Sequence, residues 1–105
     1  MILADLLYKV SIRAVLGNTN VEVNDLQIDS RKVGDASCFI AIKGSVIDGH
    51  QFIDTAIKNG AKAILCEVLP SEVSDKVTYV QVQNSAIAVG FISHNFYGAP
   101  SEKIK

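Results

Sequence analysis

The sequence is poor in the residues that mark disulfide-rich or metal-binding proteins. It contains only two cysteines, Cys38 and Cys66. They lack the paired spacing of a zinc site, and no histidine stands near them to complete a ligand set. Both lie in apolar segments typical of strands, so we expect two reduced, buried thiols that pack as small hydrophobic side chains.

The sequence also lacks a long hydrophobic run and a secretory leader. No apolar stretch approaches the roughly 18 residues that a membrane-spanning helix needs. The first ten residues, MILADLLYKV, carry Asp5 inside their apolar stretch and have no small-residue cleavage site. This pattern argues against a secretory signal. We therefore expect a cytoplasmic protein without a membrane partner.

An excess of positive charge is absent as well. Ten Lys and Arg residues stand against eleven Asp and Glu residues, spread along 105 positions. Nucleic-acid binding needs clustered cationic side chains, so we expect no nucleic-acid partner. With 49% hydrophobic and 20% charged residues, the chain has enough apolar surface for one core, and disorder is not expected.

The short motifs of complete catalysts are missing too. There is no GxxxxGK[ST] loop for nucleotide phosphates, no GxGxxG turn after a strand and no nucleophile elbow around a Ser or Cys. His50 and His94 lack further ligands at metal-binding spacing. We expect His50 to order its loop by hydrogen bonding and His94 to be a surface or packing residue, with neither catalytic. The chain resembles a binding module more than a catalyst.

Hydrophobic periodicity predicts seven elements. They are a helix over 2–10, strands over 21–28 and 38–43, a helix over 51–61, strands over 61–68 and 77–83, and a helix over 86–97. The first strand changes phase near Asn24, which indicates a bulge or bend. We expect Gly60 to end the second helix and Asn84 to cap the third. This order predicts an α/β fold, a small domain with a mixed β-sheet and flanking helices. The final SEKIK resembles the start of another strand, so we expect a domain excised from a longer protein.

Two polar segments flank the central strand 38–43. Before it, Asp29, Ser30 and Arg31 provide an acceptor, a hydroxyl and a planar cation. Such a group at a strand end can recognise a sugar, a base edge or a phosphate. The alternative is structural: Asp29 caps a turn, Arg31 pairs with a surface carboxylate and Ser30 is solvated.

After the strand comes Gly44-Ser45-Val46-Ile47-Asp48-Gly49. A glycine directly after a buried strand often marks the close approach of a ligand or another backbone. The three residues that follow Gly44 could form an apolar and hydroxyl-bearing surface for a flat ring. The alternative is an ordinary strand-to-helix connection with an Asp-Gly turn.

The chain resembles, over nearly its whole length, the N-terminal domain of the Mur ligases, in particular the MurE type, which adds the third amino acid to a UDP-N-acetylmuramoyl dipeptide. The resemblance is carried by an ordered set at family spacing: Asp29-Ser30-Arg31-Lys32-Val33, Phe39, Ala41, Gly44, Asp48-Gly49-His50, Phe52, Ala56, Gly60-Ala61, Phe96-Tyr97-Gly98 and Pro100-Ser101. One position departs from the family. A Pro-Gly-Asp turn usually places its glycine where Ala36 stands, and here Gly34-Asp35 comes earlier. We expect Gly34 to supply the permissive backbone of this turn.

The resemblance implies that residues 1–105 form one domain that binds the UDP-MurNAc end of UDP-MurNAc-L-Ala-D-Glu. Carried over by position, the uridine contacts are Ser30, Ile28, Ser45, Val46 and Ile47. The residues expected to support the two loops are Asp29, Arg31, Gly44, Asp48, Gly49 and His50.

The longer enzyme implied by the resemblance is an ATP-dependent amide ligase. Its ATP and Mg²⁺ would bind in a central domain, and a C-terminal domain would select diaminopimelate or lysine. We therefore expect no catalytic residue, metal or cofactor in this chain, which alone should be inactive. Two alternatives stay open: the N-terminal domain of a MurF-type ligase, and a stand-alone regulatory or interaction domain of the same fold.

Overall fold

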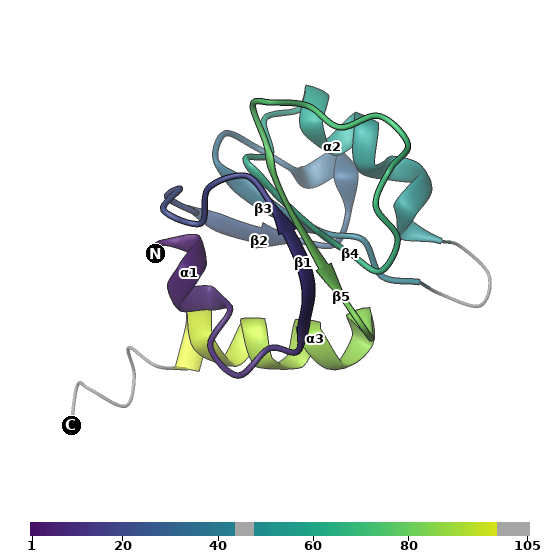
Figure 1. The fold of residues 1–105 in the computed structure, drawn as a ribbon. Helices are drawn as coiled ribbons and strands as arrows, with labels where there is room; N and C mark the ends of the chain where they lie inside the picture. Colours follow the sequence, from purple (N-terminus) through teal and green to yellow (C-terminus); the bar gives the residue numbers. More distant parts are fainter. Residues whose placement is uncertain (44–47, 99–105) are drawn as a thin grey trace.

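The computed structural model describes residues 1–43 and 48–98. Within them, one sheet contains five strands in the order β1-β5-β4-β3-β2 (Figure 1). Strands β2 to β5 are parallel, and β1 pairs with β5 in the antiparallel sense. The predicted small α/β domain with a mixed sheet is therefore confirmed. The bounds are β1 (Ile12–Leu16), β2 (Asp25–Gln27), β3 (Ser37–Ile40), β4 (Ala63–Cys66) and β5 (Thr78–Val82).

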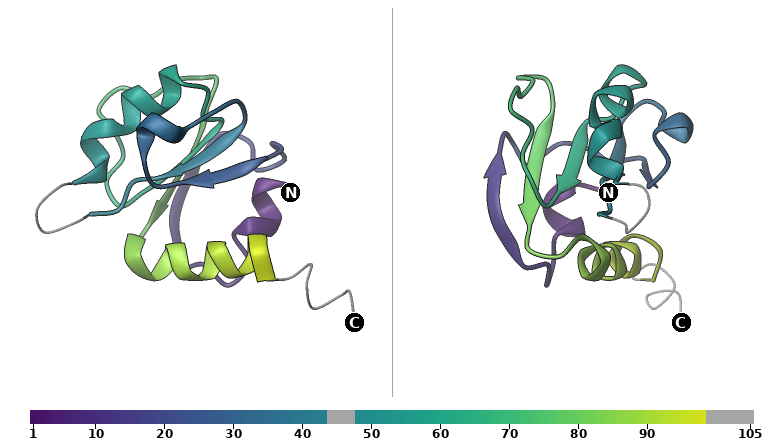
Figure 2. Two further views of the ribbon diagram at one scale, coloured as in Figure 1. Left: turned by 180° about the vertical axis from the view of Figure 1, so that it is seen from behind. Right: turned by 90° about the vertical axis from the view of Figure 1, so that its right-hand side faces the viewer.

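Helices cover both faces of the sheet, with α2 on one face and α1 and α3 on the other (Figure 2). They are α1 (Leu3–Leu6), α2 (Ile53–Lys58) and α3 (Ser85–Ser93). A 3₁₀ turn, η1 (Ser30–Lys32), lies between β2 and β3, a second, η2 (Gly49–Phe52), leads into α2, and a π turn, η3 (His94–Gly98), follows α3. Along β3, Cys38 and Ile40 enter the core beside α1 and α3, whereas Phe39 enters the core beside α2. Because β3 and β4 are buried on both faces, each appears in the sequence as a nearly continuous apolar run.

The strand β1 was not predicted from the sequence. It lies at the edge of the sheet, and all its residues except the half-buried Ala14 are exposed. A strand exposed in this way lacks the apolar alternation that marks a half-buried strand. The predicted helix over 2–10 is also shorter than expected, since Lys9 adopts a left-handed φ of 67° as the chain turns toward β1.

Local signals located several chain turns correctly. Helix α2 ends at Lys58, and Gly60 follows with a φ of 119°, so the predicted helix stop is confirmed. The Asn84 side chain accepts the N–H of Ile87 at 3.0 Å, which confirms the predicted cap of α3. Strand pairing also breaks between Glu22, which pairs with Ile2 in an isolated bridge, and the start of β2, near the change of phase in the sequence.

The turn before β3 differs from the prediction. Ala36, not Gly34, has the positive φ, of 61°. The backbone of Ala36 is hydrogen bonded on both sides, because its N–H donates to the carbonyl of Gly60 at 3.0 Å and its carbonyl accepts the N–H of Asn24 at 2.9 Å. The expectation that Gly34 supplies the permissive backbone was therefore wrong. Tertiary hydrogen bonds place the left-handed residue at Ala36, the position that the resemblance assigns to a glycine.

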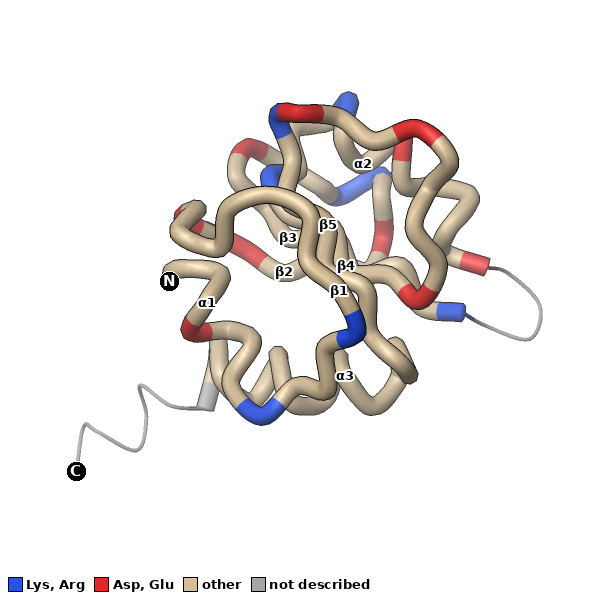
Figure 3. The backbone as a smooth tube through the Cα atoms, viewed as in Figure 1, with Lys and Arg blue, Asp and Glu red and all other residues tan. Residues whose placement is uncertain are grey.

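Both cysteines are free and buried, as predicted. Burial raises the pKa of Cys38 to about 12 and that of Cys66 to about 11. Within the described residues, positive and negative side chains are spread along the backbone tube, and α3 carries none (Figure 3). In the described ranges, no helix combines the length and hydrophobicity needed to span a membrane.

Candidate functional site

The Asp29-Ser30-Arg31 segment forms a compact turn after β2. Asp29 caps η1, since its Oδ1 accepts the N–H of Arg31 at 3.0 Å. The Arg31 guanidinium returns to the same carboxylate, with Nε donating to Oδ1 and Nη2 to Oδ2, each at 3.0 Å. These side-chain and backbone hydrogen bonds lower the pKa of Asp29 from its usual 3.8 to about 2. Asp29 and Arg31 thus satisfy each other and define the shape of η1.

Ser30 and Ile28, the two described residues of the expected uridine contact, differ in exposure. Ile28 is 61% exposed, whereas Ser30 is only 6% exposed. The carbonyl of Ser30 accepts Nδ2 of Asn59 at 2.9 Å, which joins η1 to the end of α2. The structural alternative holds for the cap at Asp29 and for the pairing of Arg31 with a surface carboxylate, which is that of Asp29. It does not hold for Ser30, which is buried and not solvated.

The second turn, Asp48-Gly49-His50, begins η2. Oδ1 of Asp48 accepts the backbone N–H of His50 at 3.0 Å and lies 2.6 Å from its Nδ1. The N–H of Gly49 donates to the carbonyl of Ile42 at 2.9 Å, and a Cβ at Gly49 would lie 2.9 Å from the nitrogen of Ile42. Only glycine permits this approach to the end of the β3 segment. Gly44, Ser45, Val46 and Ile47 lie outside the described residues.

The ring of His50 connects η2 to the end of β4. Its Nε2 accepts the N–H of Glu67 at 2.8 Å and the N–H of Val68 at 3.2 Å. An accepting Nε2 carries no proton, so the hydrogen-bond network assigns the proton to Nδ1, which donates to Asp48. His50 therefore joins the turn after β3 to the backbone that follows β4.

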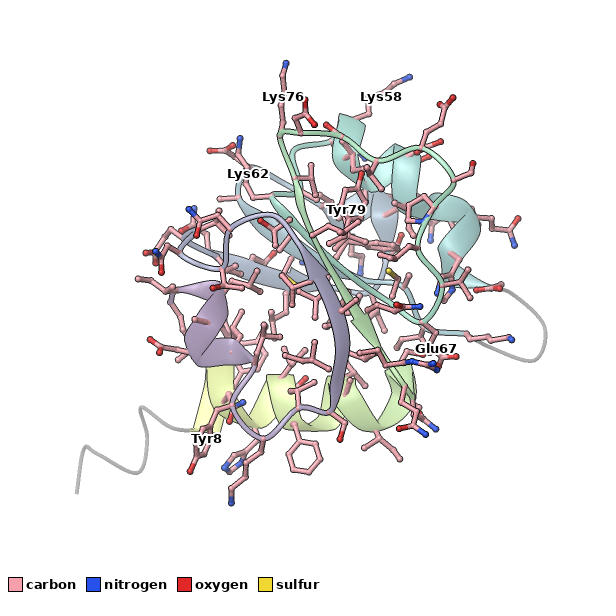
Figure 4. All side chains as sticks on the ribbon, in the orientation of Figure 1. Tyr8, Lys58, Lys62, Glu67, Lys76 and Tyr79 are labelled. Atoms are coloured by element: carbon pink, nitrogen blue, oxygen red, sulfur yellow. The ribbon has the colours of Figure 1, made fainter. Side chains whose placement is uncertain are left out.

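Glu67 and Ser85 complete the contacts at the carboxyl ends of the parallel strands. The sequence analysis did not identify either residue as part of a site. Oε2 of Glu67 accepts the N–H of Ser85 at 2.7 Å and its hydroxyl at 2.8 Å, and these two bonds lower the pKa of Glu67. The Ser85 hydroxyl in turn accepts the N–H of Lys43 at 3.1 Å. Figure 4 shows Glu67, which follows the carboxyl end of β4, near the first turn of α3. The one sequence signal that could have pointed to Glu67 is its place at the end of a predicted strand, because the carboxyl ends of parallel strands lie together.

The two turns share a neighbour, because η1 and η2 both pack against α2. Their groups are suited to hydrogen bonding and apolar contact, which is the chemistry of binding. ATP and Mg²⁺ do not fit here: the chain has no phosphate-binding glycine loop, and the described residues contain no group of three or more potential metal ligands. Three surface hollows, of about 460, 570 and 630 Å³, lie along α1, β1 and α3, away from both turns.

Sequence comparisons identify relatives of the whole chain. A family model described as "Mur ligase family, catalytic domain" matches residues 22–97. The chain is 48% identical over 106 residues to the UDP-N-acetylmuramoyl-L-alanyl-D-glutamate--2,6-diaminopimelate ligase of Cytophaga hutchinsonii, and 42% identical over 105 residues to the ligase of the same name from Bacteroides fragilis. Each alignment covers 100% of this chain and 22% of the relative. The chain thus spans about a fifth of the length of these curated relatives.

Solved structures share the fold. A crystal structure of MurF from Acinetobacter baumannii matches with a TM-score of 0.76 at 19% identity, covering 90% of this chain and 20% of that one. The MurF ligase of Thermotoga maritima, crystallised in complex with ADP, matches with a TM-score of 0.60 at 32% identity, covering 72% of this chain and 17% of that one.

Proposed function

The chain belongs to the Mur ligase family, and on this premise we propose that it binds the UDP-MurNAc end of UDP-MurNAc-L-Ala-D-Glu in a longer, MurE-type ligase of peptidoglycan precursor synthesis. The observation that carries the proposal is the alignment of the entire chain with ligases of that name, at up to 48% identity. Residues 1–105 would be the N-terminal domain of such a ligase, and a central and a C-terminal domain would complete it.

The uridine site proposed here uses both turns. Ile28 and Ser30 would contact the uracil ring from the first turn, and Ser45, Val46 and Ile47 from the segment after β3. A flat ring with polar edges needs an apolar surface and a few hydrogen bonds. Ile28 offers such a surface, since its side chain is largely exposed. In this proposal the residues that hold the two loops in shape are Asp29, Arg31, Gly44, Asp48, Gly49 and His50.

The remaining chemistry belongs to other parts of the longer chain. There, the γ-phosphoryl group of ATP would pass to a substrate carboxylate, giving ADP and an acyl phosphate. The nitrogen of the incoming amino acid would attack the acyl carbon, form the amide and release inorganic phosphate. No residue of this chain takes part in these steps. The amine to test first is 2,6-diaminopimelate, because it appears in the names of the relatives.

A MurF-type role is the second candidate, favoured by the 32% identity with the Thermotoga maritima enzyme. MurF-type ligases act one step later, on the tripeptide precursor. The two roles therefore predict different substrates for the same domain.

The experiment is a phosphate-release assay of the full-length protein with ATP, Mg²⁺ and an amine. Turnover with UDP-MurNAc-dipeptide and diaminopimelate supports the MurE-type proposal. Turnover only with UDP-MurNAc-tripeptide and D-alanyl-D-alanine would replace it with the MurF-type role. Absence of turnover with either precursor would contradict both.

A further inference from the structure

We infer that Asn59, the residue directly after α2, is a positioning residue of the substrate site, which acts by holding the turn that carries Ser30. The inference rests on the proposed function, since the contact serves binding only if Ser30 meets the substrate. Asn59 is not among the residues that carry the family resemblance, although its neighbour Gly60 is. It is therefore a further determinant of substrate binding, contributed by a residue outside the turn itself.

Contacts within η1 hold the Asp29 side of the turn more firmly than the Ser30 carbonyl. Oδ1 of Asp29 accepts the N–H of Arg31, and the carbonyl of Asp29 accepts the N–H of Lys32, each at 3.0 Å. The carbonyl of Ser30 accepts the N–H of Val33 at 3.4 Å, which is beyond the usual length of such a bond. Local contacts alone therefore leave the Ser30 carbonyl weakly held.

Asn59 supplies the shorter hydrogen bond to this carbonyl. Its Nδ2 donates to the carbonyl oxygen of Ser30 at 2.9 Å. Because a carbonyl oxygen only accepts, the contact requires the amide nitrogen of Asn59 and not its oxygen. Ser30 is buried, whereas Asn59 is exposed. A substitution at Asn59 therefore removes the donor without opening a cavity in the hydrophobic core.

The next residue, Gly60, holds the other end of the connection between β2 and β3. Its carbonyl accepts the N–H of Ala36 at 3.0 Å, and its backbone packs closely against Gly34. Two consecutive residues after α2 thus hold this connection at two places, one near Ser30 and one near Ala36. Because the Ala36 end has its own contact, loss of the Asn59 side chain should loosen the Ser30 turn and leave the entry into β3 in place.

The test compares steady-state kinetics of the full-length protein with those of its Asn59→Ala and Asn59→Asp variants. Aspartate has the shape of asparagine, but its ionised carboxylate cannot donate a hydrogen bond. We expect both variants to raise the KM for UDP-MurNAc-dipeptide about three- to fivefold, the effect of one neutral hydrogen bond. The KM for ATP and kcat should stay within about twofold, because both depend on other parts of the enzyme. Asn20→Ala and Asn20→Asp make the same changes at an exposed position between β1 and β2 and should leave all three constants unchanged.

A double variant shows whether Asn59 acts through Ser30. Ser30→Ala removes the hydroxyl that is proposed to meet the substrate but keeps the carbonyl that Asn59 holds. Adding Asn59→Ala to Ser30→Ala should therefore raise the substrate KM by less than a further factor of about two, because the two residues form one unit. Ser71→Ala makes the same change as Ser30→Ala at an exposed position between β4 and β5 and should not affect this KM.

A variant that folds incompletely lowers the amount of active enzyme, and therefore the apparent kcat, without raising the KM for one substrate. If Ser30→Ala raises the substrate KM and Asn59→Ala does not, the inference fails and the proposed function stands. The inference also fails if the two effects multiply in full, or if Asn59→Ala alone raises the KM, because Asn59 would then not act through Ser30. If neither single variant raises it, both the inference and the proposed role of the Ser30 turn fail.

Discussion

Ala36 and Gly60 are two left-handed residues joined by a hydrogen bond, with φ values of 61° and 119°. The N–H of Ala36 donates to the carbonyl of Gly60 at 3.0 Å. This contact braces the turn that leads into β3 against the end of α2. We therefore expect opposite effects on stability from adding a methyl group at Gly60 and from removing the methyl group of Ala36.

Replacing Gly60 with alanine should destabilise the fold. A Cβ at Gly60 would lie 2.9 Å from the carbonyl oxygen of Gly34, in a backbone conformation that side chains avoid. We expect the free energy of unfolding of the 105-residue chain to fall by about 2 kcal/mol or more, measured by urea denaturation. Gly90→Ala is the matched control, because its added Cβ would meet no atom within 4 Å beyond its chain neighbours and the nearby backbone of its own helix. It should raise the free energy of unfolding by about 0.5–1 kcal/mol. Similar losses of stability in both variants would contradict a specific steric conflict at Gly60.

Replacing Ala36 with glycine should stabilise the fold. Glycine removes the steric cost of the left-handed conformation, about 1–2 kcal/mol, and adds an entropy cost of about 0.5–1 kcal/mol. The same urea experiment should show a gain of up to about 1.5 kcal/mol. Ala86→Gly deletes the same methyl group from the exposed side of α3 and should destabilise. A loss of stability in Ala36→Gly would show that the turn does not need a permissive residue.

The Asp29 and Arg31 pair should make stability depend on pH in the acidic range. Because the pKa of Asp29 is lower in the folded chain than its usual 3.8, ionised Asp29 favours the folded state. This contribution is present above about pH 4 and is lost as the pH falls toward about 2.

The substitution Arg31→Leu tests this pH dependence, since it removes the side-chain hydrogen bonds that are the largest cause of the lowered pKa and keeps the backbone N–H of residue 31. A carboxyl-carbon NMR titration should then show the pKa of Asp29 raised from about 2 toward its usual 3.8. Lys32→Leu is the control and should shift it less, because Lys32 is the weakest of the groups that lower it. A pKa near 3.8 in the unsubstituted chain would contradict the observed pairing.

Neither cysteine should react with thiol reagents while the chain is folded. Burial raises both thiol pKa values, so almost no thiolate is present near neutral pH. Labelling with a disulfide reagent at pH 8 should be slow in native buffer and rapid for both residues in denaturant. Val68→Cys, at a position that is 61% exposed, should label quickly in the folded state. Fast labelling of Cys38 or Cys66 in the native chain would contradict their burial.

The sequence predicted the parts of the fold that follow local rules. Phe39 and its neighbours reveal a central strand because both faces of β3 are buried, and Asn84 reveals a helix start because capping depends on residues three positions apart. The edge strand β1 escaped prediction because exposure removes its pattern. Similarly, Ala36 adopts the left-handed conformation because its backbone forms hydrogen bonds with distant residues. The local preference of glycine for this conformation had favoured Gly34.

The candidate site shows the same division. Asp29 and Asp48 could be found because each caps a turn within its own segment. Glu67 and Ser85 could not, because they are 18 residues apart and meet only when β4 and α3 pack together. Long-range hydrogen bonds of this kind leave no spacing signal in a single sequence.

A calorimetric titration of the full-length protein with UDP-MurNAc-L-Ala-D-Glu tests nucleotide binding by the first turn, when the native sequence is compared with Ser30→Ala. We expect Ser30→Ala to raise the Kd about tenfold, the effect of one lost hydrogen bond in a buried site, and Ser71→Ala to leave it unchanged. Equal affinities for the native protein and Ser30→Ala would contradict the assignment of this domain's first turn to the nucleotide.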